Sequence, residues 1–483
     1  MSPTQPRNAT CPPPISAAAS SGDATLAQGP ARNSSNARAS ADAVTRKVSR
    51  HLLGFLFLLF VVSFLDRINI GFAGLTMMKD LGLTSTQFGF ATTLFYLAYI
   101  ACGIPSNLAL ARFGARRWIA FIMIAWGLAS TATMFATDAR TLYGLRMLVG
   151  VTEAGFLPGM LLYLTCWFPP AWRARANALF MIAMPVTAAF GSAVSGFVLR
   201  LDGHLGLAGW QWLFLLEGLP AALLGCVAFC YLDDAPAAAR WLSPAEKRTL
   251  EAELASASAT REAHSEQTGL WQQIRSPLVI RFAAAYFCLV NTLAMVAVWA
   301  PLIVKSFSAG ASNVTIGLIA TIPQIATIVA MIVWGRSSDR RQERKWHLIA
   351  PMLLAALGCL LCASSGAPLV QLLCVCLASA GSYTAMSIFW TTPDQAFSPA
   401  ARAVGLAVIN AIGNLSSAAN PLVVGWLKDM THSYAAGLGY SAALLVIGTL
   451  IVVRLPGGPK SARHDAHDVE AADDADDATR AAA

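Results

Sequence analysis

The sequence predicts an all-α membrane protein with about twelve transmembrane helices, arranged as two pseudo-symmetric bundles of six. Three observations support this prediction. Apolar residues make up 56% of the 483-residue chain and charged residues only 12%, which is about half the charged fraction of a typical soluble domain. The charged residues lie in short segments between apolar runs, and these runs reach the roughly 20 residues that a bilayer-spanning helix needs. A hydrophilic stretch near the middle separates six such runs from six more.

The apolar runs define the elements of each bundle. In the N-terminal bundle, residues 50–232, we expect spans over 52–77, 86–110, 117–137, 140–167, 174–200 and 210–231. In the C-terminal bundle, residues 278–456, we expect spans over 278–305, 313–335, 346–366, 368–392, 401–426 and 437–455. Two sets of six around a polar connector suggest a duplicated architecture.

The remaining segments are polar. Residues 1–49 are rich in Ala, Ser, Asn and Pro and lack an apolar core, so they predict a disordered N-terminal tail, with a start codon assigned too far upstream as the alternative. Residues 457–483 predict a disordered acidic tail. In the connector, residues 233–277, the run Ser243-Pro244-Ala245-Glu246 has the pattern of a capping box, which predicts a short surface helix after it.

Lysine and arginine residues concentrate on one side of the predicted membrane. The segments on that side contain Arg46, Lys47, Arg50, Arg112, Arg116, Arg117, Arg173, Arg175, Lys247, Arg248, Arg336, Arg340, Arg341, Arg344 and Lys345, against Lys79, Arg140, Arg200, Lys305 and Lys428 on the other. By the positive-inside rule, both termini are expected in the cytoplasm and the chain in the cell membrane. The net charge of +8 does not indicate nucleic-acid binding, because the basic residues lie between apolar spans and not on one face.

A similar motif follows span two and span eight. The two copies are Gly103-Ile-Pro-Ser-Asn107 with Arg112-Phe-Gly114-Ala-Arg116-Arg117, and Gly335-Arg-Ser-Ser-Asp339-Arg340-Arg341. Glycine lets helices approach closely, a carboxylate or amide accepts hydrogen bonds, and arginine anchors at the lipid headgroups. We interpret Gly335, Asp339, Arg340, Arg116 and Arg117 as a gating cluster, with ordinary headgroup anchoring as the alternative.

These copies resemble the loop signature of the major facilitator superfamily, G-x-x-x-D-R-x-G-R-R, although Asn107 replaces its aspartate in the first copy. Further segments are similar to one branch, the anion:cation symporter family. They are Leu65-Asp66-Arg67-Ile68-Asn69-Ile70-Gly71-Phe72-Ala73, Gly209-Trp-Gln-Trp-Leu-Phe-Leu-Leu-Glu217-Gly-Leu-Pro220, Ala239-Arg-Trp-Leu-Ser-Pro-Ala-Glu246-Lys and Ile409-Asn410-Ala-Ile-Gly413-Asn414. The resemblance extends over residues 50–455. It implies the major facilitator fold and the import of organic anions, often sugar acids and small carboxylates, together with protons.

Five charged residues lie deep inside predicted spans, all in the first half: Asp66, Arg67, Arg146, Glu153 and Glu217. A charge at the bilayer centre costs about 2.5–3.5 kcal/mol on insertion scales, so each requires a reason. Arg146 and Glu153 are seven residues apart and therefore share one face of span four. The resemblance places spans one and four at a central cavity.

Side-chain chemistry suggests roles for these groups. An arginine keeps its charge and grips a carboxylate through two hydrogen bonds, so Arg67 and Arg146 are predicted to bind the substrate. A partly desolvated carboxylate takes up a proton more readily, which suits Asp66 and Glu153 for proton coupling. Without substrate, each carboxylate can pair with an arginine. Buried structural ion pairs are the alternative, and for Glu217 helix packing or gating is expected.

Uncharged residues complete the predicted pocket. Tyr99, Asn410, Asn414 and Trp390 are expected to line it, with helix–helix hydrogen bonding as the alternative for each. A second half without deep charges would bind hydroxyl groups of the substrate. The glycines of span four, including Gly155, suggest close packing and bending.

The chain shows no pattern of a metal cluster, catalytic triad or nucleotide site, so no metal, no cofactor and no enzymatic activity are expected. Sodium coupling is disfavoured because no oxygen cluster around an unwound helix is evident. The expected protein is a monomer that transports a small organic anion with protons by alternating access. Export or exchange of neutral or cationic compounds is the alternative, and tartrate-like, aldonate, aromatic carboxylate and amide-bearing anions all remain as substrates.

Overall fold

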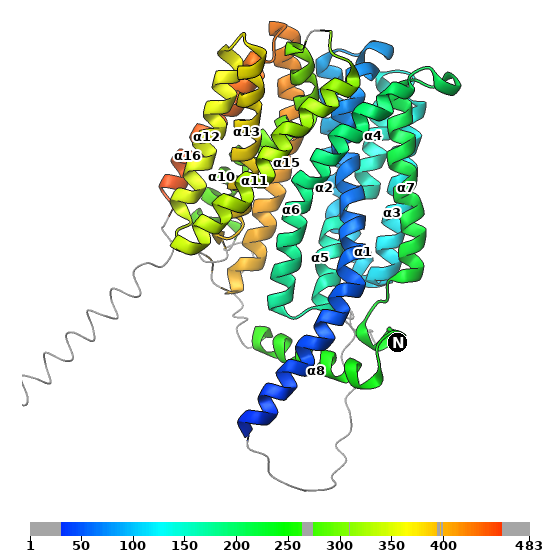
Figure 1. Ribbon diagram of the computed structural model, residues 1–483, viewed down its shortest axis with the longest axis vertical. Coiled ribbons are helices and arrows are strands. Elements are labelled where there is room, and N and C mark those ends of the chain that lie inside the picture. Colours follow the sequence, from blue (N-terminus) through cyan, green and yellow to red (C-terminus); the bar gives the residue numbers. More distant parts are fainter. Residues whose placement is uncertain (1–29, 263–273, 309, 394–396, 398, 456–483) are drawn as a thin grey trace, which may run out of the picture.

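The structure is a computed structural model that describes residues 30–262, 274–308, 310–393, 397 and 399–455. Every regular element in these residues is helical. Twelve segments are long and apolar enough to cross a membrane, which confirms the predicted fold class. Figure 1 shows them as two bundles side by side, the N-terminal one in blue to green and the C-terminal one in light green to red.

Seven helices build the six spans of the N-terminal bundle. They are α1 (Pro30–Asp80), α2 (Ser85–Phe113), α3 (Ala115–Ala132), α4 (Ala139–Glu153), α5 (Phe156–Trp167), α6 (Pro170–Val198) and α7 (Gly209–Tyr231). Helices α4 and α5 together form span four. Short 3-10 turns, η1 (Thr133–Phe135), η2 (Leu199–Leu201) and η3 (His204–Gly206), connect some of these helices.

Six helices build the C-terminal bundle. They are α10 (Pro277–Phe307), α11 (Asn313–Arg341), α12 (Lys345–Ser364), α13 (Pro368–Phe389), α15 (Pro399–Thr431) and α16 (Ala435–Val453). Proline begins α10, α13 and α15, a position at which its missing N–H breaks no helical hydrogen bond.

The connector contains a 3-10 turn, η4 (Pro236–Ala238), and α8 (Pro244–Glu262). As the capping-box pattern predicts, Ser243 N–H donates to Glu246 at 2.8 Å and Glu246 N–H donates to Ser243 Oγ at 3.3 Å. Lys47 Nζ binds Glu246 at 2.9 Å and so ties α1 to α8. Figure 1 places α8 beside the start of α1, and we call this end of the molecule the α8 end and the opposite one the far end.

The observed chain differs from the expected segments at its N-terminal side. Helix α1 begins at Pro30, so residues 30–49 continue the first span as helix instead of forming a separate tail. The rest of the expected N-terminal tail and the expected C-terminal tail lie outside the described residues.

The outer surface of both bundles is apolar. Large side chains exposed on it include Ile104, Phe190, Val333, Leu369 and Leu450, at 58–74% exposure. In water such a surface would be an extended apolar patch, whereas acyl chains solvate it without penalty.

The two bundles join at the far end. Asp429 at the end of α15 accepts hydrogen bonds from Ser85 N–H at 3.0 Å, Thr86 N–H at 2.7 Å and Thr86 Oγ at 2.6 Å, at the start of α2. Lys305 Nζ donates to Leu75 O at 2.6 Å, linking α10 to α1. Among the described residues, every hydrogen bond recorded between the bundles lies in this half of the molecule.

Candidate functional site

The centre of the N-terminal bundle holds an ion pair between α1 and α4. Arg67 Nε lies 2.6 Å from Glu153 Oε1. The Glu153 side chain is fully buried, whereas that of Arg67 is 23% exposed. The Arg67 guanidinium also lies 4.9 Å above the ring of Tyr99, so Tyr99 contributes its ring face to the site.

Arg146, on the same face of α4 as Glu153, is almost completely buried at 2% exposure. Its guanidinium lies 4.9 Å above the Phe95 ring, and its Nε and Nη1 find no hydrogen-bond acceptor among the described residues. Gly150 makes this placement possible, because a Cβ there would lie only 2.2 Å from Phe95 O and the two helices could not pack so closely. Burying a charged donor without a hydrogen-bond acceptor costs more free energy than burying a neutral one in the same way. A structural ion pair therefore does not explain the placement of Arg146.

Span four is interrupted directly after Glu153. Gly155 has φ +88°, and a Cβ there would lie 2.1 Å from Ser106 Oγ, so the position requires glycine. The interruption agrees with the expected bend.

Asp66 does not form the expected pair with an arginine. It is 2% exposed, and its carboxylate accepts hydrogen bonds from Trp126 Nε1 at 2.8 Å, from Asn69 Nδ2 at 2.9 Å and from Ser130 Oγ. Three donors satisfy a carboxylate well without a cation. Asp66 therefore joins α1 to α3, and Glu153 is the carboxylate that contacts an arginine.

Tyr96 of α2 is a site residue that the sequence analysis missed. The charges of Arg67, Glu153 and Arg146 all act on its hydroxyl group, and it in turn acts on Tyr383 of α13. Tyr96 is therefore a neighbour of the charged cluster. Its position one turn from Tyr99 on the same helix face was the available signal.

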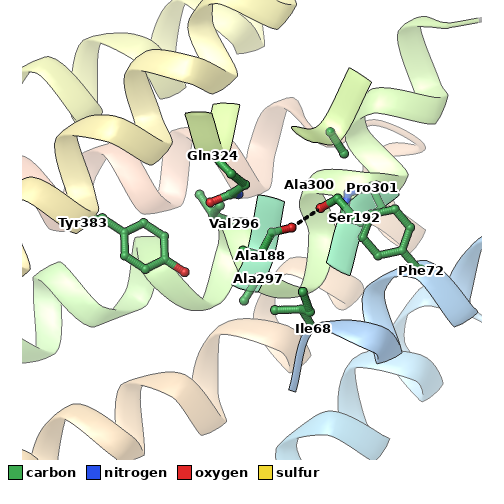
Figure 2. A pocket seen from close by; sticks show the side chains of 11 residues that line it. Ile68, Phe72, Ala188, Ser192, Val296, Ala297, Ala300, Pro301, Gln324 and Tyr383 are labelled. Atoms are coloured by element: carbon green, nitrogen blue, oxygen red, sulfur yellow. Dashed lines mark hydrogen bonds between the residues drawn. The ribbon is translucent and has the colours of Figure 1, made fainter. Parts of the chain in front are cut away.

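A small cavity between the bundles adds further uncharged groups (Figure 2). Figure 2 shows Ile68 and Phe72 on one side of it and Gln324 and Tyr383, from α11 and α13, on the other. Gln324 is 6% exposed, and its Oε1 has no donor among the described residues. Tyr383 is 4% exposed. Neither residue was predicted from the sequence, although a lone amide inside an apolar span is a detectable signal.

Three predicted residues lie away from this cavity. Asn410 is exposed and Asn414 partly exposed, both on α15. Trp390 packs edge-on against Tyr286, with ring centroids 5.0 Å apart. None of the three lines the cavity of Figure 2.

The two motif copies make contacts within their own bundles. Asp339 pairs with Arg344 Nη2 at 2.7 Å, at the start of α12. Arg116 N–H donates to Asp234 at 3.0 Å and its Nε donates to Phe229 O at 2.7 Å. The remaining predicted members, Gly335, Arg340 and Arg117, show no close packing: a Cβ at Gly335 would meet no atom within 4 Å, and both arginines are exposed.

Comparisons with known proteins agree on one family. The family model described as Major Facilitator Superfamily matches residues 56–421 and 283–471. The chain is 42% identical over 416 residues to a putative tartrate transporter of Agrobacterium vitis, covering 85% of this chain and 94% of that protein. It is 33% identical over 408 residues to a quinolone resistance transporter of Acinetobacter baumannii, covering 84% and 94%. The inward open xylose transporter XylE from E. coli matches with a TM-score of 0.69 and 15% identity, covering 85% of this chain and 97% of that one, a likeness of fold alone. The chain belongs to the major facilitator superfamily.

Proposed function

We propose that the protein imports a small hydroxylated organic anion together with protons, through the cell membrane and by alternating access. The observation that carries this proposal is the buried guanidinium of Arg146, which lacks a bonded acceptor beside the Arg67–Glu153 pair. A carboxylate substrate supplies the missing acceptor. Its binding would offset the desolvation of a guanidinium that the fold otherwise leaves without a hydrogen-bond acceptor.

Glu153 and the substrate compete for the same arginine. With Glu153 ionised, its carboxylate occupies Arg67 Nε. Protonation of Glu153 removes that attraction and frees Arg67 for the incoming anion, which couples one proton to one anion. The coupling has an energetic reason, since an interior at −100 mV opposes entry of one negative charge by about 2.3 kcal/mol and a proton that enters with it cancels this cost.

The C-terminal bundle supports a hydroxylated substrate. Gln324 Oε1 is a buried acceptor without a donor, and a hydroxyl group on the substrate would donate to it. The hydroxyl of Tyr383 faces the same cavity (Figure 2). The relative named as a putative tartrate transporter fits this reading, because tartrate carries both carboxylates and hydroxyls.

We assign the α8 end to the cytoplasm, together with both termini, because the basic segments lie there. The far end, where Asp429 and Lys305 join the bundles, then faces the outside. In this orientation the hydrogen bonds between the bundles lie on the outer side of the membrane, which supports a conformation that opens toward the cytoplasm.

The test is uptake of labelled tartrate into proteoliposomes under an imposed pH gradient, compared with succinate, which has the same two carboxylates without hydroxyls. We expect accumulation that follows the pH gradient, a preference for tartrate, and loss of uptake in Arg67→Ala. Arg200→Ala, an exposed arginine at the far end, is the matched control and should keep wild-type uptake. A sodium gradient that drives uptake without a pH gradient would contradict proton coupling.

A second candidate function is proton-driven export of neutral or cationic compounds, favoured by the similarity to a quinolone resistance transporter. Two buried or half-buried arginines oppose cation binding, because a like charge would have to enter the same site. One experiment distinguishes the two candidate functions. If proteoliposomes move a fluoroquinolone against its gradient but do not move carboxylates, the export function replaces the anion proposal.

A further inference from the structure

Glu217 on α7 is a buried carboxyl group that the proposed transport cycle does not use. It is 3% exposed and lies near the start of α7, inside the membrane-spanning segment. Ser195 Oγ of α6 donates to its Oε1 at 3.0 Å, but Oε2 is buried without a hydrogen-bond partner among the described residues. An ionised carboxylate in this position would be desolvated with only one donor, which is strongly unfavourable.

The groups that face Glu217 offer no positive charge to compensate. Its charged neighbour is Asp66 of α1, which is negative. Helix α6 contributes the neutral Ser195, and α3 contributes Thr131, beside Gly218. The basic residues of α3, Arg116 and Arg117, lie at the opposite end of that helix. A second negative charge next to Asp66 would add repulsion to the desolvation penalty.

Asn69 completes the arrangement from α1. It is fully buried, and its Nδ2 donates to Asp66 at 2.9 Å. Its Oδ1 is buried without a donor. The Asn69 side chain is a hydrogen-bonding neighbour of Glu217 and acts as a donor to the ionised carboxylate. Within the described residues, Asn69 Oδ1 and Glu217 Oε2 are both buried and neither accepts a hydrogen bond.

A single proton satisfies both atoms. We propose that Glu217 is held as a neutral carboxylic acid whose O–H donates to Asn69 Oδ1, and that this bond positions α1 and the Arg67 that it carries. Asp66, with its three donors, keeps the negative charge, and Asn69 bridges the neutral acid to that anion. Glu217 is thus a positioning residue and not a proton carrier.

The bond acts on Arg67 through the helix. Asn69 follows Arg67 by two residues, so the contacts of Asp66 with α3 and of Asn69 with α7 hold α1 on both sides of Arg67. Rotation of α1 about its axis would carry the Arg67 guanidinium away from Glu153 and from the Tyr99 ring. Removal of the Glu217 donor should therefore weaken substrate binding without touching the binding site directly.

Two variants of Glu217 test whether its side chain acts as a neutral acid or as an ionised carboxylate. Glu217→Gln keeps a donor to Asn69 and an acceptor for Ser195, so we expect KM for uptake within about twofold of wild type. Glu217→Leu leaves Asn69 Oδ1 without a donor. The free-energy penalty for such a buried unpaired group, taken at the low end of its usual range, corresponds to about a tenfold rise in KM, which is the result we expect. Equal damage by both variants would overturn the proposal. So would a Glu217→Gln protein that exchanges substrate but no longer accumulates it, since Glu217 would then carry a proton.

Infrared spectroscopy of the purified protein at neutral pH tests the protonation state without any transport assay. The carbonyl band of a protonated carboxylic acid should be present in wild type, absent in Glu217→Gln and moved to higher frequency in Asn69→Leu. Glu153→Gln is the matched spectral control and should retain the Glu217 band. If Glu217→Gln shows the same acid band as wild type, the inference is wrong. This test does not depend on whether Glu217→Leu folds. The uptake readout rests on the proposed function, whereas the infrared result does not, so a failure of one is distinguishable from a failure of the other.

Discussion

Glu153→Gln is the substitution that tests the coupling mechanism most directly. Glutamine keeps the shape of the side chain but cannot carry the charge that occupies Arg67 Nε at 2.6 Å. The variant should therefore behave as a permanently protonated Glu153. It should bind the substrate anion tightly at any pH and exchange it across the membrane, but it should not accumulate it along a pH gradient.

The size of the effect follows from the contact. Two unit charges 4 Å apart attract by about 4 kcal/mol at an effective dielectric constant of 20. The net contribution of a charge-assisted hydrogen bond is smaller, about 1.5–3 kcal/mol, because water and reorganisation offset part of the attraction. Since the Arg67 side chain is 23% exposed, we use the lower end of that range. Affinity for tartrate at pH 7.5 should then rise about tenfold in Glu153→Gln.

The assay is isothermal titration calorimetry of tartrate binding between pH 5.5 and 8. In wild type, protonation of Glu153 favours binding, so affinity should rise as the pH falls, by at most about tenfold per pH unit for one coupled proton. In Glu153→Gln the affinity should not change with pH. Glu251→Gln, on α8 and outside the spans, is the matched control and should keep the wild-type pH dependence. A Glu153→Gln protein whose affinity still falls with rising pH, as steeply as in wild type, would refute the assignment of Glu153.

Three further substitutions test the elements around the site. Gly155→Ala introduces a Cβ 2.1 Å from Ser106 Oγ at a position with φ +88°, so it should lower both the melting temperature and the uptake rate, whereas Gly103→Ala, with open space around it, should leave uptake unchanged. Asp429→Asn removes the charge that accepts three hydrogen bonds at the start of α2 and should open the far end, measured as longer spin-label distances there. The pKa of Glu246 lies below its usual range because Ser243 N–H and Lys47 donate to its carboxylate. The ionised form therefore stabilises the fold above the unfolded-state pKa, and this stabilisation is lost as the pH falls through the folded-state pKa. Glu246→Gln should lower stability at pH 7 by at most about 1 kcal/mol and leave it unchanged at pH 3, as thermal unfolding can measure.

The fold was predictable because the bilayer imposes a simple requirement on the sequence. Each span needs a long apolar run, and the twelve observed segments coincide with runs that composition alone reveals. Polar residues predicted an element boundary where the interaction is between neighbours in the sequence, as in the capping box that starts α8. The break after Glu153 was harder to place, since span 140–167 is continuous in hydropathy. Gly155 suggested a bend, but only its contact with Ser106 of α2 shows why the helix is interrupted there.

The candidate site was predictable in composition but not in pairing. A deep charge is visible in a sequence, and Arg67 and Glu153 do meet. Which carboxylate meets which partner depends on the rotation of each helix about its own axis, which periodicity in a uniformly apolar span does not define. Asp66 therefore turned out to bind Trp126 and Ser130 of α3. For the same reason Gln324 and Tyr383, which line the cavity, were missed in favour of Asn410 and Asn414.

The balance of charges in the N-terminal bundle links the coupling to the state of Glu217. Arg67 and Arg146 contribute two positive charges, and Asp66 and Glu153 contribute two negative ones, so the cluster is neutral if Glu217 is a neutral acid. A monoanion added to a neutral cluster at membrane depth leaves a net negative charge, which a low-dielectric interior strongly opposes. One proton on Glu153 restores neutrality. If Glu217 were ionised, the empty cluster would already be negative and would repel the substrate. Proton coupling to Glu153 and a neutral Glu217 are therefore two parts of one electrostatic requirement.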